Sequence, residues 1–306
     1  MRRTDGRYLL SGGRGAFFRE SQSLSQCEFV VAAELDTGER EACVFLGAPL
    51  SREDIETHLA GLVSEMELVG WDDTEQAVIA RRERRLGALC IAEARLPAPD
   101  AGLVRAALLE GLGRLGLDAL PWTPAARSFC QRAEFVRRHV HPEDPGWPPC
   151  DGHALGTTLA AWLEPWLDGI TRRSQLARLD LRAILTARFT HAQLREIDQL
   201  APTHLVVPSG SRVAIDYGDV DAPCIAVRLQ EVFGMMTTPR IAGGRVPLTL
   251  SLLSPAQRPV QVTRDLGSFW ARGYTEVRKE LKGRYPKHYW PDDPLTATPT
   301  RRVRPK

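Results

Sequence analysis

The sequence has 306 residues, of which 43% are hydrophobic and 25% charged, and its formal net charge is +2. This length and composition predict two or three globular domains and exclude a chain that is disordered throughout. No uncharged apolar run approaches the ~18 residues that a membrane span needs. No apolar segment follows the N-terminal MRRTDGRYLL, as it would in a secretory signal. We therefore expect a soluble, cytoplasmic protein without membrane contact.

The basic residues are unevenly distributed. Only four of the 40 are lysines, namely Lys279, Lys282, Lys287 and Lys306. From Arg258 to Lys306 there are 12 basic and 5 acidic side chains, whereas the rest of the chain carries 28 basic and 33 acidic ones. A basic C-terminal end favours a polyanionic partner, although an arginine excess also follows from a GC-rich genome.

The pattern of the first segment, residues 1–98, predicts short strands between glycine turns. Strands are expected at 8–10, 16–18, 29–35, 43–46, 67–71, 77–82 and 88–92, with the turn DTGER at 36–40. Ser51 and Asp54 predict a capping box that opens a helix to about Met66. Several short strands interrupted by one helix predict a small β-barrel of the OB type.

In residues 99–202 the apolar residues recur with the period of an α-helix. Asp100, Thr123, Asp180 and Thr190 are expected to cap helices, and Val104, Leu108, Leu112 and Leu115 form one apolar stripe. We predict a compact helical bundle here.

From 203 to 290 the period returns to strands, at HLVVP, SRVAIDY, CIAVRL, 246–253 and 260–263, followed by two short helices. This segment is predicted to be a mostly antiparallel β-rich part of a C-terminal domain, so the whole chain belongs to the α+β class. The proline-rich basic segment 291–306 is predicted to be a flexible tail.

Motifs of common enzymes are missing. There is no GxxxxGK[ST] phosphate loop, no HExxH and no GxSxG. Ser209 and Ser211 in PSGSR, with His204 nearby, are more typical of a hairpin turn than of a nucleophile loop. We therefore expect no catalytic residue and no bound cofactor in this chain.

The cysteines and histidines include one group of potential metal ligands. The six cysteines are widely spaced and include no CxxC pair, which predicts reduced, buried thiols. One segment combines several potential zinc ligands, namely Cys130, His139, His141, Cys150 and His153. Its spacing lacks the paired knuckles of structural zinc sites, so we expect no metal there.

Two segments are candidates for nucleic-acid contact. In RRERR, strand alternation sends Arg81 and Arg85 to one face and Arg82 and Arg84 to the other. One reading is a barrel face that presents guanidinium groups to phosphates, and the other is a solvated edge strand protected by charge.

The second segment, KGRYPKHYWPDDP at 282–294, interleaves cations with aromatic rings: Lys282, Arg284, Tyr285, Lys287, His288 and Trp290. Cations beside stacking aromatics are typical of single-stranded nucleic-acid binding. The alternative is a structural strap whose rings are buried anchors.

Several segments together resemble the region C-terminal to the motor of HrpB-type ATP-dependent RNA helicases, a branch related to the DEAH-box proteins. The most specific are AVRLQEVFG (226–234), GGRVPLTLSLLSPAQRPVQVTRDL (243–266) and KGRYPKHYWPDDP (282–294), supported by GRYLLSGGRGA (6–16), ARRERRLGAL (80–89), GLDALPWTPAAR (116–127) and VPSGSRVAIDY (207–217).

The resemblance implies an OB-fold module followed by the family's C-terminal domain, with RNA and the helicase motor domains as partners. The RecA-like motor domains of the family have no counterpart in this sequence, so ATP and Mg would enter only through them. The implied function is an accessory, non-catalytic region that contacts nucleic acid or regulates the motor. The alternatives are a free-standing nucleic-acid-binding protein and a protein-docking module without RNA contact.

Overall fold

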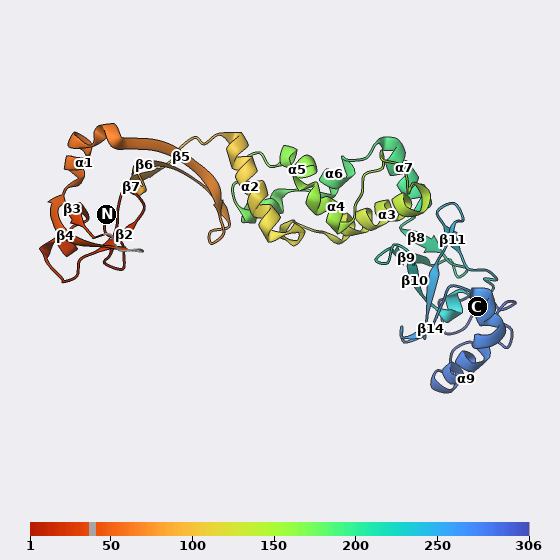
Figure 1. Ribbon diagram of the computed structural model, residues 1–306. Coiled ribbons are helices and arrows are strands. Elements are labelled where there is room, and N and C mark those ends of the chain that lie inside the picture. Colours follow the sequence, from red (N-terminus) through yellow and green to blue (C-terminus); the bar gives the residue numbers. More distant parts are fainter. Residues whose placement is uncertain (37–40, 306) are drawn as a thin grey trace. The chain divides into compact units, whose positions relative to one another are not determined.

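A computed structural model of the chain describes residues 1–36 and 41–305 (Figure 1). The chain divides into two compact units: unit 1 comprises Met1–Arg114 with Leu167–Gln175, and unit 2 comprises Leu115–Trp166 with Leu176–Lys306. Both units contain helices and strands, which confirms the α+β class. The units are coarser than the four segments expected from the sequence (1–98, 99–202, 203–290 and 291–306), whose boundaries stay predictions.

Unit 1 begins with a four-stranded sheet in the order β1-β2-β4-β3. Its strands are β1 (Tyr8–Leu9), β2 (Gly15–Phe17), β3 (Phe29–Leu35) and β4 (Glu41–Leu50). β2 pairs with β4 in parallel, whereas the other neighbours are antiparallel. The strands flanking the expected turn at 36–40 are present, while residues 37–40 of that turn lie outside the described residues.

The helix that follows is shorter than the sequence suggests. α1 (Arg52–His58) has the expected Ser51–Asp54 capping box, but it does not continue to Met66. Val63–Met66 instead belong to β5 (Val63–Asp72), which pairs with β6 (Ala77–Leu86) along its whole length. Ten cross-strand pairs override a weak helical preference, because propensity yields to tertiary pairing. β7 (Leu89–Arg95) completes this antiparallel sheet in the order β5-β6-β7.

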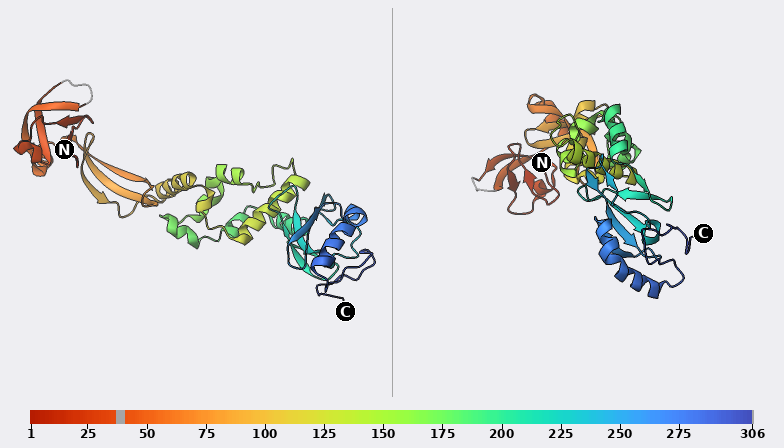
Figure 2. Two further views of the ribbon diagram at one scale, coloured as in Figure 1. Left: turned by 90° about the horizontal axis from the view of Figure 1, so that it is seen from below. Right: turned by 90° about the vertical axis from the view of Figure 1, so that its right-hand side faces the viewer.

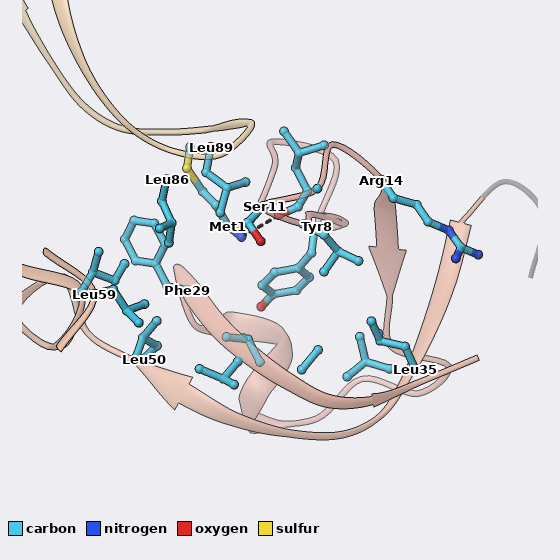
Figure 3. A pocket seen from close by; sticks show the side chains of 18 of the residues that line it. Met1, Tyr8, Ser11, Arg14, Phe29, Leu35, Leu50, Leu59, Leu86 and Leu89 are labelled. Atoms are coloured by element: carbon cyan, nitrogen blue, oxygen red, sulfur yellow. Dashed lines mark hydrogen bonds between the residues drawn. The ribbon is translucent and has the colours of Figure 1, made fainter. Parts of the chain in front are cut away.

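The apolar core of the N-terminal strands surrounds a pocket (Figure 3). One cluster gathers around Tyr8 and Val44 and another around Phe29 and Ile55, and the pocket of about 380 Å³ is lined by residues of both. Arg14 is the only charged side chain among the described residues that line it. The pocket is therefore an apolar feature of the core and not a surface for a polyanion.

α2 (Ala101–Leu115) packs on the β5–β7 sheet of unit 1. Asp100 caps it as predicted, since its Oδ1 accepts a hydrogen bond from the Leu103 amide at 2.9 Å. The helix contacts the sheet at Gly111, where a Cβ atom would lie 2.1 Å from Cδ2 of the Trp71 ring. A glycine is required there because the indole occupies the space of a side chain.

Unit 2 opens with the helices α3 (Pro124–Val140), α4 (Gly152–Thr157), α5 (Leu159–Leu163), α6 (Leu181–Thr186) and α7 (His191–Leu200). Of these, α3, α6 and α7 begin at predicted caps. Thr123, Asp180 and Thr190 each accept a hydrogen bond from a backbone amide of the first turn. These caps satisfy amides that have no partner within the helix.

A five-stranded sheet follows, in the order β14-β13-β10-β9-β8. Its strands are β8 (His204–Val206), β9 (Arg212–Asp216), β10 (Cys224–Arg228), β13 (Thr249–Leu253) and β14 (Pro259–Thr263). β10 and β13 are parallel and the other neighbours antiparallel, in line with the mostly antiparallel part that the sequence predicts. A two-stranded ribbon of β11 (Arg240–Ile241) and β12 (Val246–Pro247) lies between β10 and β13 in the chain.

The chain ends with α8 (Leu266–Ser268), a π-helical turn η7 (Phe269–Gly273) and α9 (Tyr274–Arg284). The following segment stays beside the sheet of unit 2 in both views of Figure 2. Ala297 and Thr300 are buried, and the Thr300 amide donates to the carbonyl of Gln230 at 2.9 Å. The sequence predicts a flexible tail at 291–306, but the structure packs residues 291–305 on unit 2, because backbone hydrogen bonds and these buried side chains hold them there.

No helix in the described residues, 1–36 and 41–305, combines the length and apolarity that crossing a bilayer requires.

Candidate nucleic-acid interface

The arginines of RRERR alternate across β6 as predicted, but β6 is the central strand of its sheet, so the edge-strand reading is wrong. On one face, Arg81 and Arg85 both pair with Glu83, at 2.7 and 2.9 Å. Glu83 is only 3% exposed, so its carboxylate faces these two cations rather than water. Removing it from water is tolerable because two guanidinium groups surround it.

On the other face the partners come from neighbouring elements. Arg82 pairs with Glu67 of β5 at 2.9 Å, and Arg84 pairs with Glu56 of α1 at 2.8 Å. All four guanidinium groups of RRERR therefore already have a carboxylate partner. A phosphate would have to compete with these carboxylates, which weakens the case for RNA contact at β6.

The aromatic residues of 282–294 differ in exposure. Trp290 is 7% exposed, and its indole N–H donates to the Tyr285 carbonyl at 2.9 Å. No ring face is open for a base, so Trp290 is a structural anchor and we leave it out of the proposed interface. Tyr285 is half-buried and meets the His288 ring edge-on.

His288 does not contribute a cation near neutral pH. Burial, followed by the nearby charge of Arg228, lowers the pKa of His288 below its usual value. Its Nδ1 lies 3.2 Å from Oε1 of Gln230, a residue that is itself buried. His288 therefore ties the segment to η6 (Leu229–Glu231).

The lysines and Arg284 lie on the outside. Lys282, Arg284 and Lys287 are exposed, and Lys282 and Lys287 make no ion pair with any described residue. Arg284 lies 3.3 Å from Glu280, but both side chains are more than half exposed, so this pair is screened by water and salt. These three cations remain available to an external anion.

The C-terminal segment adds cations that sequence reasoning did not assign to a site. Arg301, Arg302 and Arg304 are exposed. They lie beside 285–289, since the Tyr289 amide donates to the Val303 carbonyl at 2.9 Å and Arg304 Nε donates to the Lys287 carbonyl at 3.3 Å. In the sequence, the run RRVRPK indicates a cluster of cations. Only the fold shows that this cluster lies beside Lys287.

We call the six exposed cations of this region the C-terminal basic surface: Lys282, Arg284, Lys287, Arg301, Arg302 and Arg304. Of the nearby carboxylates, Asp292 pairs with Arg278 and Glu280 lies 3.3 Å from Arg284, while the other five cations of the surface make no ion pair with a described residue. The surface has the charge that phosphate contact requires.

The residues considered for zinc do not converge. His139 Nε2 lies 3.0 Å from the Val220 carbonyl, and His141 Nε2 lies 2.7 Å from Glu196. His153 is exposed, whereas Cys130 and Cys150 are buried together. One group of three potential ligands occurs among the described residues, Glu83, Cys90 and Glu93, and there Glu83 already binds two arginines.

The PSGSR serines are held in a turn. Ser209 donates from Oγ to Glu231 at 2.9 Å, and Ser211 bonds to the same carboxylate. His204 Nδ1 lies 3.0 Å from the hydroxyl of its neighbour Thr203. These contacts stabilise the loop between β8 and β9 and do not form a nucleophile–base pair.

Two family descriptions match the chain. Residues 162–294 match the ATP-dependent helicase C-terminal family of HrpB, and residues 62–96 match the connector region of the ATP-dependent RNA helicase HrpB. The ATP-dependent RNA helicase HrpB of Escherichia coli (strain K12) is 39% identical over 302 residues. The chain matches the C-terminal region of the HrpB helicases. The two matched regions contain both candidate segments, RRERR and 282–294.

Solved HrpB structures agree in fold. A crystal structure of the E. coli DExH-box NTPase HrpB has a TM-score of 0.64 at 39% identity and covers 98% of this chain. A second, of the Escherichia coli DEAH/RHA helicase HrpB, has a TM-score of 0.55 at 36% identity over 94% of the chain. The chain spans 37% of the length of the curated HrpB and 37% and 36% of these two solved chains, and it matches their C-terminal part.

Proposed function

We propose that this chain is the accessory C-terminal region of an HrpB-type RNA helicase and that it contacts RNA through the C-terminal basic surface. The observation that carries the proposal is the contrast between two sets of cations. Each arginine of RRERR has a glutamate partner, and Glu83 between Arg81 and Arg85 is buried, whereas Lys282, Lys287, Arg301 and Arg302 have no ion-pair partner among the described residues. Unpaired exposed cations release counterions when they bind phosphates.

A salt-dependent RNA titration tests this proposal. In the variant with Arg301, Arg302 and Arg304 changed to alanine, we expect weaker binding to a single-stranded RNA. The slope of log K against log salt should fall in magnitude by about 0.7 for each phosphate contact removed, or about two units in all. Fluorescence anisotropy at several salt concentrations measures both quantities.

The matched control is the Arg82→Ala, Arg84→Ala variant, which removes exposed arginines that already have carboxylate partners. We expect it to keep the affinity and the salt slope of the unchanged chain. An unchanged slope in the C-terminal variant, or an equal loss in the β6 variant, would refute the C-terminal basic surface as the RNA contact.

A second candidate function is docking of a protein partner, as expected of a region that accompanies a motor. Large apolar side chains are exposed on β3 and β4, with Val31, Phe45 and Leu46 at 46%, 56% and 59% exposure. Exposed apolar groups of this kind are typical of interaction surfaces. RNA affinity that neither variant changes, together with binding to a helicase motor, would favour this function.

We further propose that the chain neither holds ATP nor hydrolyses it. The sequence contains no GxxxxGK[ST] loop to cradle phosphates. The purified chain should show no ATP turnover above background in a phosphate-release assay, with or without RNA. Turnover that survives purification and disappears with a point mutation in this chain would contradict the proposal.

For the architecture, we infer an OB-type barrel at the N-terminus and a helical bundle in the middle of the chain. The first is supported by short strands around an apolar core and by α1 between β4 and β5. The second is supported by α3 to α7 of unit 2, which follow one another along the chain and are joined by loops and 3-10 turns.

A further inference from the structure

Two buried cysteines of unit 2 are direct neighbours, although 19 residues separate them in the chain. Cys130 lies on α3 and Cys150 just before α4. They are 6% and 5% exposed, and their side chains are hydrogen-bonded to each other. Neither the proposed RNA contact nor a metal site uses this thiol pair.

The pair is not sealed inside the core. Both cysteines line an open cleft of about 380 Å³, together with Trp122, Arg127 and Gln131. The Arg127 guanidinium lies over the Trp122 ring, 5.1 Å from its centroid. A small molecule can therefore approach the sulfur atoms through a cleft with a polar and cationic rim.

The surrounding charges make the two thiols unequal. Arg188 donates to Cys150 Sγ at 3.6 Å and to the Pro149 carbonyl at 3.0 Å. The hydrogen bond from Cys150 lowers the pKa of Cys130 against the opposing effect of burial, and Arg188 lowers it further. The same hydrogen bond, together with burial, raises the pKa of Cys150. The lowered pKa of Cys130 and the raised pKa of Cys150 favour Cys130 as the nucleophile and Cys150 as the resolving thiol.

We propose that Cys130 and Cys150 form a redox-active dithiol, which a small-molecule disulfide converts into an intramolecular disulfide bond. The Cys130 thiolate attacks one sulfur of the small disulfide, which forms a mixed disulfide and releases one thiolate. Cys150 gives its proton to that thiolate and attacks the Cys130 sulfur, which releases the second thiolate. The two cysteines are oxidised by two electrons, and the small disulfide is reduced to one thiol and one thiolate, which takes up a proton from water.

Exposure and reactivity make opposite predictions for the other cysteines. Cys27, Cys90 and Cys224 are more exposed than the pair. Burial raises the pKa of Cys90 and of Cys224, which keeps both thiols protonated. If accessibility alone decides, these three react first, whereas the proposal places Cys130 first.

The test treats the folded, full chain with glutathione disulfide and follows each cysteine by peptide mass spectrometry without reduction. We expect a disulfide between the tryptic peptides 128–132 and 139–172, which contain Cys130 and Cys150. Cys130 should react at least about tenfold faster than Cys224, because reaction requires the thiolate. Absence of this linkage while Cys27, Cys90 or Cys224 becomes glutathionylated would overturn the proposal.

Two variants separate the roles of the sulfur atoms. Cys150→Ser should accumulate glutathione on Cys130, since the resolving thiol is gone, whereas Cys130→Ser should leave Cys150 unmodified. The matched control, Cys224→Ser, should form the 130–150 linkage at the rate of the unchanged chain. Circular dichroism verifies that each variant is folded. Equal modification of Cys150 in folded Cys130→Ser would refute the assigned order.

Discussion

Replacing Trp290 with alanine is expected to lower the free energy of unfolding of unit 2 by about 3–5 kcal/mol, the usual cost of deleting a large buried aromatic side chain. Trp290 is 7% exposed and donates its indole N–H to the Tyr285 carbonyl at 2.9 Å. The change would leave a cavity and would remove one of the two hydrogen bonds that the Tyr285 carbonyl accepts, the other coming from the His288 amide at 3.1 Å. Urea denaturation followed by far-UV circular dichroism measures the loss.

The control for this change is Lys287→Ala, three residues away and exposed. It should alter the free energy of unfolding by no more than about 0.5 kcal/mol, as surface substitutions usually do. Trp290→Phe should fall between the two variants, since it keeps a ring but loses the hydrogen bond. A Trp290→Ala chain as stable as Lys287→Ala would show that 285–290 is not anchored by this side chain and would return Trp290 to the candidate RNA contacts.

Gly111→Ala is expected to destabilise unit 1 by about 1–3 kcal/mol, the range for overpacking a filled core. On an exposed helix the same change gains up to about 1 kcal/mol, because alanine has the higher helix propensity. At Gly111 the change in the free energy of unfolding has the opposite sign, because the new Cβ would lie 2.1 Å from Cδ2 and 2.4 Å from Cε2 of Trp71. A buried indole ring cannot move aside as the end of a flexible side chain can.

The same helix provides a matched control at Gly113, where an added Cβ would meet nothing within 4 Å. Gly113→Ala should raise the free energy of unfolding by up to about 1 kcal/mol. Thermal melts of the two single variants measure the difference in sign. Stabilisation by both changes would contradict the close packing of α2 on Trp71.

The basic residues of the C-terminal segment could be located from the sequence, but the way in which this segment packs could not. The excess of cations after Arg258 is visible in the composition, and Lys282, Arg284 and Lys287 are exposed as a binding strip requires. The packing of 291–305 was missed because it depends on Gln230, whose carbonyl accepts from Thr300, about 70 residues away in the chain. A proline-rich composition carries no signal for such a distant partner.

The sequence by itself determined the local features: the helix caps at Asp100, Thr123 and Thr190, the alternation of the arginines across β6, and the basic excess near the C-terminus. The caps and the alternation depend on residues within one turn of helix or one strand, so neighbouring side chains are sufficient to specify them, and the basic excess is a property of composition alone.

Tertiary structure decided which cations remain unpaired and which thiols meet. Glu56 and Glu67 neutralise β6 from α1 and β5, and Cys150 reaches Cys130 across 19 intervening residues. Ion pairs and thiol contacts depend on separations of a few ångströms in space, and only the folded backbone sets those separations.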